Sequence, residues 1–72
     1  MKKDILIQFG NRVRQERVKR NLSQEELAEK ADMHRTYIGM IERAEKNITL
    51  LNIKKIANAL KLPLSKLFNF DE

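Results

Sequence analysis

The stretch from residue 34 to residue 43 carries side chains suited to recognising the edges of nucleic acid bases. If this stretch is a helix that buries Ile38 and Ile41, helical geometry fixes the face that it turns outward. That face holds Arg35, Thr36, Gly39, Met40 and Arg43. An arginine can bind guanine O6 and N7 through two hydrogen bonds, and a threonine methyl can contact a thymine methyl. We therefore predict that Arg35, Thr36 and Met40 read DNA bases.

Short helices must position this face, because the apolar residues recur with helical spacing. Only two Gly and one Pro interrupt the chain, and no long window alternates apolar and polar residues as a strand would. The first, third and fifth predicted helices cover about residues 3–20, 34–43 and 64–69. The second begins at the cap Ser23 and ends near Ala31, and the fourth follows the cap Thr49 and is marked by Ile53, Ile56, Ala57 and Leu60. The expected fold class is all-α, a compact five-helix bundle that forms a single domain over residues 1–72.

Two sequence signals mark where these helices begin or pack closely. Ser23 and Glu26 have the spacing of a capping box, in which each side chain satisfies a backbone N–H of the other residue. Thr49 is the expected N-cap of the fourth helix. Gly10 lies on the apolar stripe of the first helix with Ile5, Phe9 and Val13, where it can admit a close neighbour.

The charge balance favours a polyanionic partner. The 72 residues carry 15 Lys and Arg against 10 Asp and Glu, a net charge of +5, and the pI is about 9.8. Residues 1–20 and 34–66 are basic, whereas the acidic segment 21–33 contains the start of a helix, where negative charge is favourable. The chain contains no Cys, which excludes a disulfide or a thiolate zinc site. Nucleic acid and an acidic membrane surface are the candidate partners.

A capped helix, a short turn and a second helix form a helix-turn-helix, the unit that places its second helix in a major groove. Residues 22–28 and 34–43, together with Arg17, resemble the Cro/repressor-type (XRE) helix-turn-helix family. The resemblance runs from Phe9 to Phe68 and implies a phage-repressor-like fold. Residues 35–38, 41–43 and 47–49 are also similar to the small controller proteins of restriction–modification systems, in a pattern shared with prophage and plasmid repressors.

The resemblance implies further DNA contacts. Tyr37 would contact a base or the backbone, although its ring can instead close the core with the hydroxyl in water. The family's phosphate-binding positions, at the start of the second helix and in the loop after the third, correspond here to Ser23, Gln24, Arg43, Lys46 and Asn47. The alternative for the last three is a generic solvated loop, and for Gln24 a solvated first-turn residue.

The resemblance also implies structural roles. Arg17 and Glu42 occupy the positions of an ion pair that ties the first helix to the end of the third, and His34 that of a helix N-cap. The family usually has Gly in the turn and after the third helix, where this chain has Asp32 and Ala44. A left-handed conformation costs Ala about 1 kcal/mol, so either the exit of the third helix differs or some stability is given up.

Four other basic residues of the first helix are expected to form a solvated face and are not included in the site. These are Arg12, Arg14, Lys19 and Arg20.

One helix-turn-helix covers too few base pairs to find an operator, so we predict a symmetric homodimer on a palindromic site. Leu60, Leu62 and Leu67 can complete the core. The apolar residues left over form the predicted dimer interface, namely Leu50, Leu64, Phe68 and Phe70. The alternative is that Phe70 frays while Leu64 and Phe68 pack within the monomer.

Other functional classes fit less well. His34 is the one His of the sequence, and it has no Cys or Ser-His-Asp context and no carboxylate at ligand spacing. We therefore expect no enzyme, metal site, cofactor or small-molecule ligand. The apolar runs are short, so we expect neither a signal peptide nor a membrane span. Their absence favours a cytoplasmic location for a regulator of bacterial or phage type. A membrane-surface peptide conflicts with the capping box and the five segments.

The prediction is a sequence-specific regulator of transcription that binds double-stranded DNA. The serious alternative is a protein-interaction module of the same fold, such as an antitoxin or a bridging protein, whose binding surfaces would lie away from residues 34–43.

Overall fold

The structure is a computed structural model that describes residues 4–70. It contains the helices α1 (Asp4–Lys19), α2 (Gln24–Ala31), α3 (Arg35–Glu42), α4 (Leu50–Leu60) and α5 (Leu64–Leu67), and no strand occurs between residues 4 and 70. The predicted all-α five-helix fold is confirmed, with helix ends within two residues of those expected. Lys3, the expected first residue of α1, and the predicted domain ends, residues 1–3 and 71–72, lie outside the described residues.

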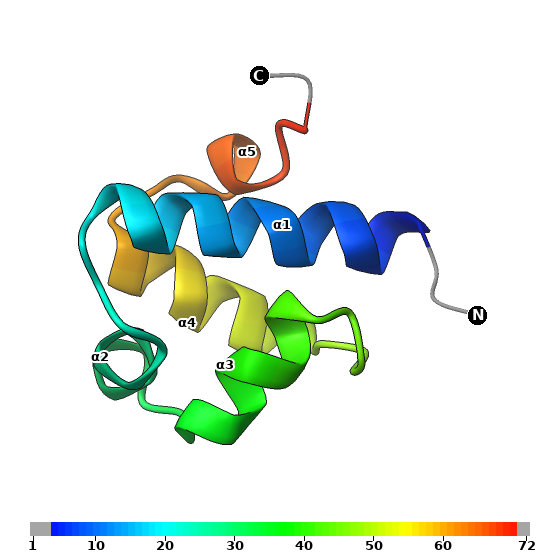
Figure 1. Cartoon of the computed structure of the whole chain (residues 1–72). Coiled ribbons are helices and arrows are strands. Elements are labelled where there is room, and N and C mark those ends of the chain that lie inside the picture. Colours follow the sequence, from blue (N-terminus) through cyan, green and yellow to red (C-terminus); the bar gives the residue numbers. More distant parts are fainter. Residues whose placement is uncertain (1–3, 71–72) are drawn as a thin grey trace.

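The other four helices are arranged around the longest one, α1 (Figure 1). In this view α2, α3 and α4 lie below α1, and α5 lies above it. The helix pairs with the most extensive contacts are α1 with α3 and α5, α2 with α3 and α4, and α4 with α5. This arrangement leaves the outer faces of α2 and α3 uncovered, side by side at one end of the molecule.

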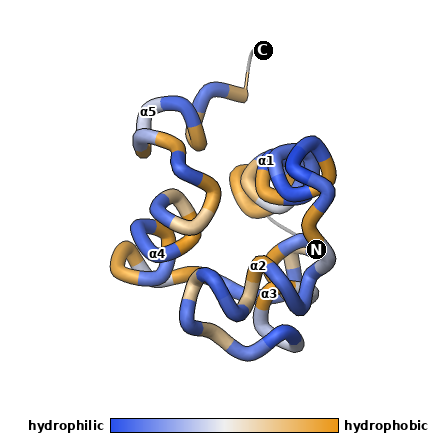
Figure 2. The backbone as a smooth tube through the Cα atoms, turned by 90° about the vertical axis from the view of Figure 1, so that its left-hand side faces the viewer, coloured by the Kyte–Doolittle hydropathy of each residue, from blue (hydrophilic) through white to orange (hydrophobic). Residues whose placement is uncertain are grey.

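A single apolar core joins all five helices. Hydrophobic and hydrophilic segments alternate along α1 and α4, as the helical period requires (Figure 2). The largest fully buried side chains come from every element and are Val13, Leu27, Ile38, Ile56, Leu60 and Leu67. Leu60 and Leu67 therefore complete the core as predicted, and Leu62 packs against it.

The buried stripe of α1 is shorter than predicted. Ile5 is 53% exposed, so its expected place on the buried stripe is wrong, and Val18 near the other end of α1 is 54% exposed. The physical reason is length: α1 has 16 residues, whereas α3 and α5, which pack against it, have eight and four. Only the central turns of α1 are covered.

Gly10 marks the point where α1 and α3 come closest. A Cβ atom built at Gly10 would lie 2.5 Å from the carbonyl oxygen of Ile41 and 2.9 Å from that of Glu42. The close neighbour expected at Gly10 is therefore the backbone at the end of α3.

The two positions where the family usually has Gly adopt the left-handed conformation. The φ angles are 56° at Asp32 and 59° at Ala44. The exit of α3 thus has a left-handed geometry, closed by a hydrogen bond from the Glu45 N–H to the Met40 carbonyl (2.9 Å). Of the two alternatives for Ala44, the structure has the one in which stability is given up.

Candidate nucleic-acid interface

Side-chain caps fix where both helices of the helix-turn-helix begin. The Ser23 hydroxyl accepts a hydrogen bond from the Glu26 N–H (3.0 Å), and the Glu26 carboxylate accepts one from the Ser23 N–H (2.8 Å). The bond from the Ser23 backbone lowers the pKa of Glu26 below its ordinary value. At α3, His34 Nδ1 accepts from the Thr36 N–H (3.1 Å), so His34 is the N-cap that the resemblance implies.

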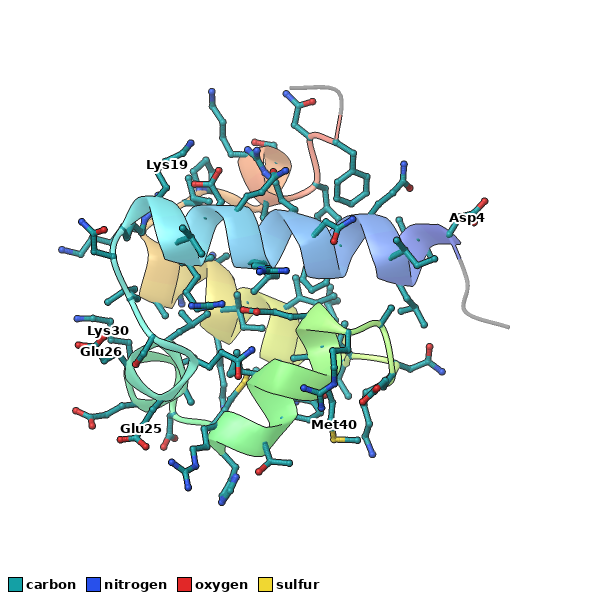
Figure 3. The ribbon with its side chains drawn as sticks, viewed as in Figure 1. Asp4, Lys19, Glu25, Glu26, Lys30 and Met40 are labelled. Atoms are coloured by element: carbon teal, nitrogen blue, oxygen red, sulfur yellow. The ribbon has the colours of Figure 1, made fainter. Side chains whose placement is uncertain are left out.

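The outer face of α3 presents part of the predicted base-reading set. Arg35 and Thr36 are exposed and Met40 is half-buried. Figure 3 shows Met40 on the outer side of α3 and Glu25 on the outer side of α2. Arg35 Nη1 donates to Glu25 Oε2 (2.7 Å), and both side chains are about two-thirds exposed. A carboxylate of α2 therefore holds the guanidinium beside the face that would meet DNA.

Gly39 departs from the expected outward face because it is buried. A Cβ atom at Gly39 would meet Arg43 Nη1 at 3.0 Å and Gln24 Oε1 at 3.4 Å. The long side chains of Gln24 and Arg43 lie over the glycine and cover it. The absence of a side chain at residue 39 is what lets both extend across α3.

Tyr37 is half-buried and packs against the core. Its hydroxyl accepts a hydrogen bond from Asn52 Nδ2 (3.3 Å). The Tyr37 ring thus closes the core, as the alternative to a DNA contact predicted. Its hydroxyl, however, is bonded to Asn52 of α4 and was expected in water.

An ion pair anchors the junction of α1, α2 and α3. Arg17 Nε and Nη2 donate to the two oxygens of Glu42 at 2.7 and 3.1 Å, and Arg17 Nη1 donates to the Leu22 carbonyl (2.8 Å). The bond to Glu42 raises the pKa of Arg17 above its already high ordinary value. Gln24 Nε2 also donates to Glu42 Oε1 (3.1 Å). The amide implied to bind phosphate is therefore held in place by the ion pair.

The remaining phosphate-binding candidates are exposed. Ser23 begins α2, and Lys46 and Asn47 lie in the loop between α3 and α4. Arg43, at the end of α3, donates to Glu45 Oε1 (3.1 Å) from Nε. The structure thus brings Gln24 and Arg43 together over Gly39.

Sequence reasoning missed a buried charged cluster on α1. Glu16 and Arg12 are 2% and 7% exposed. The prediction that Arg12 lies on a solvated face is therefore wrong. Glu16 Oε2 lies 3.2 Å from Arg12 Nη1, and its carboxylate also pairs with Lys19 and Arg20. Arg12 Nη2 donates to the Lys66 carbonyl of the α5 segment (2.9 Å).

Two opposing effects act on the Glu16 carboxyl. Burial raises its pKa, but the hydrogen bonds from Arg20 and Lys19 and the charge of Arg12 outweigh burial, so the pKa lies below its ordinary value. The spacing could have revealed the cluster, because residues 12 and 16 continue the helical stripe set by Phe9 and Val13.

The four apolar residues predicted for the dimer interface divide into two groups. Leu50 is 74% exposed and Phe68 is 39% exposed, whereas Leu64 and Phe70 are half-buried against the core. The expectation that Leu64 and Phe70 are surplus to the core is therefore wrong.

An aromatic chain explains the packing of Phe70. Phe68 stacks on Phe9, with ring centroids 5.5 Å apart, and Phe70 meets Phe68 edge-on at 6.2 Å. Leu51, 67% exposed beside Leu50, is an apolar surface residue that sequence reasoning missed, because helical spacing alone did not separate it from the core.

Between residues 4 and 70 no three His, Cys, Asp or Glu side chains come close enough together to hold a metal ion. No helix in the same part of the chain has the length and apolar character needed to cross a membrane.

Comparison with known proteins places this geometry in a family. The helix-turn-helix family model matches residues 13–67. The chain is 48% identical to control protein C.BamHI of Bacillus amyloliquefaciens over 97% of this chain and 88% of that protein, and 48% identical to control protein C.SmaI of Serratia marcescens over 89% and 76%. The solved restriction-modification controller protein C.AhdI from Aeromonas hydrophila superimposes with a TM-score of 0.84 at 42% identity, covering 86% of this chain and 94% of that one. This chain belongs to the Cro/repressor-type (XRE) helix-turn-helix family of DNA-binding transcriptional regulators.

Proposed function

We propose that this protein is a sequence-specific regulator of transcription that places α3 in the major groove of its operator, in the manner of a restriction–modification controller. The observation that carries the proposal is the outer face of α3, where Arg35 and Thr36 are exposed next to the capped start of α2. The similarity to C.BamHI, C.SmaI and C.AhdI supports the controller assignment.

The proposed base contacts come from Arg35, Thr36 and Met40, with Tyr37 at the edge of the face. The side chain of Arg35 is long enough to reach guanine, and the carboxylate of Glu25 orients its guanidinium. The proposed phosphate contacts come from the ends of the motif and the loop, namely Ser23, Gln24, Arg43, Lys46 and Asn47. Backbone contacts of this kind set the register of the protein on the duplex.

The proposed assembly is a symmetric homodimer that forms through the exposed apolar residues of α4 and Phe68. Leu50 and Leu51 stand at the start of α4 with two-thirds or more of their surface in water. Two copies would match two half-sites about 34–36 Å apart. The proposed site of action is the cytoplasm, on duplex DNA.

Selection of duplexes from a random pool by the purified protein, followed by footprinting, tests the proposal. We expect enrichment of a palindromic sequence, with two protected half-sites one helical turn apart. Enrichment of no sequence above the starting pool would contradict it.

A further inference from the structure

A depression of about 250 Å³ opens where α1, α2 and α3 meet. Three guanidiniums, one amide and one carboxylate line it, from Arg14, Arg17, Gln24, Glu42 and Arg43. Positive groups outnumber the single carboxylate, so the depression suits a small anion.

The ion pair between Arg17 and Glu42 forms the floor of the depression. Arg17 and Glu42 bond each other through both carboxylate oxygens, and Glu42 is 3% exposed in its side chain. Because Arg17 and Glu42 bond each other, a ligand in the depression would be bound by the other side chains that line it. Gln24 Nε2 uses one hydrogen on Glu42, and its second amide hydrogen has no partner among residues 4–70.

Arg14 differs from the other arginines of this junction. Its side chain is exposed on α1, and the described part of the chain offers it no hydrogen bond or ion pair. Arg12 and Arg17 on the same helix, and Arg20 directly after it, all bond carboxylates. A cation on the rim without an internal partner has its full hydrogen-bonding capacity available.

The depression adjoins the DNA-reading face. Gln24 and Arg43 reach it by crossing Gly39 of α3, the helix that carries Arg35 and Thr36. An anion in the depression would therefore lie beside the major-groove edge of a duplex into which α3 is inserted.

We propose that the depression holds one phosphodiester of the operator backbone, with Arg14 binding it together with Gln24 and Arg43. This inference rests on the proposed function and adds Arg14 to it as a phosphate-binding residue. Arg14 brings α1 into the interface, so a single phosphate would be held by three helices.

The test compares Arg14→Gln with the matched control Lys61→Gln. Lys61 is also exposed but lies on the link between α4 and α5, outside the depression. The probe is the duplex that the wild-type protein selects from a random pool, and Kd is measured by fluorescence anisotropy at several salt concentrations. For Arg14→Gln we expect roughly tenfold weaker binding and a salt slope smaller by about 0.9 for each half-site. Lys61→Gln should retain the wild-type slope, and Arg14→Lys should regain most of it.

Duplexes in which a neutral methylphosphonate replaces one phosphate at a time locate the contact. We expect one position in each half-site where the replacement weakens wild-type binding but does not weaken Arg14→Gln further. Equal salt slopes for Arg14→Gln and Lys61→Gln, or additive losses at every phosphate, would overturn the Arg14 assignment while wild-type binding still supports the function. A wild-type protein that binds no duplex would overturn both.

Discussion

The same residue type performs different tasks in this protein because its surroundings differ. Arg12 is buried and bonds Glu16 and a carbonyl of the α5 segment, whereas Arg35 is two-thirds exposed and bonds an exposed carboxylate. The outward position of Arg35 could be predicted from the sequence, because Ile38 and Ile41 define the buried side of α3. Charge alone does not predict the burial of Arg12, which follows from its place on the apolar stripe of α1.

Substitution of two arginines should separate base reading from phosphate binding. Arg35→Ala should weaken binding to the selected operator by about 1–3 kcal/mol and relax the preference at one base pair. Arg43→Ala should weaken binding to all duplexes nearly alike and reduce the salt slope. Binding to the operator and to a shuffled duplex measures both effects. Equal losses on the two duplexes for Arg35→Ala would contradict its base-reading role.

The buried Glu16 should make stability depend on pH in the acid range. Because its pKa is lower in the folded protein than in the unfolded chain, the ionised carboxylate stabilises the fold above the ordinary value of 4.5. This stabilisation is lost as the pH falls through the lowered pKa. Glu16→Gln should therefore be less stable than wild type at neutral pH, and the gap should narrow towards about pH 2. Urea unfolding at both pH values measures the gap, and a gap that does not change with pH would contradict the assignment.

At the scale of the elements, the helix starts were the most predictable feature. The capping box at Ser23 and the N-cap at Thr49 are both present, because a cap depends on residues only three positions apart. The covered length of α1 was less predictable, since it depends on how far α3 and α5 extend along it. The cover over Gly39 also depends on side chains from two different helices.

The two glycines should respond differently to an added methyl group. Gly10→Ala places a Cβ 2.5 Å from a backbone oxygen of α3, so the helices must separate, at a cost of about 1–3 kcal/mol in unfolding free energy. Gly39→Ala meets the flexible end of Arg43 instead, and alanine gains up to about 1 kcal/mol of helix propensity. Urea unfolding of the two variants tests this difference. A Gly10→Ala protein as stable as Gly39→Ala would contradict the close contact.

At the scale of the whole molecule, the all-α fold was predictable because each helix carries its own periodic pattern. The exposed apolar surface proposed for dimer formation was predictable only in part. Counting apolar residues identified Leu50 and Phe68 but missed Leu51, and it included Leu64 and Phe70, which pack against the core. A count cannot separate the two sets, because the packing of α5 against α1 and α4 decides which residues the core uses.

The homodimer is tested by charging the most exposed part of this surface. Leu50→Glu combined with Leu51→Glu should leave the fold intact, since both side chains are largely in water, and should shift the sedimentation of the protein from dimer to monomer. Val18→Glu is the matched control, because Val18 is 54% exposed on α1. A wild-type protein that sediments as a monomer at high micromolar concentration, and binds the palindrome as a monomer, would contradict the dimer.

If α3 reads a specific sequence in duplex DNA, the protein must distinguish that sequence from others of the same composition. The most direct measurement is the affinity of the wild-type protein for the selected palindrome and for a shuffled duplex of the same composition, between about 50 and 200 mM salt. We expect the palindrome to bind at least about a thousandfold more tightly than the shuffled duplex, and both affinities to fall steeply with salt. Equal affinity for the two duplexes at every salt concentration would contradict this expectation.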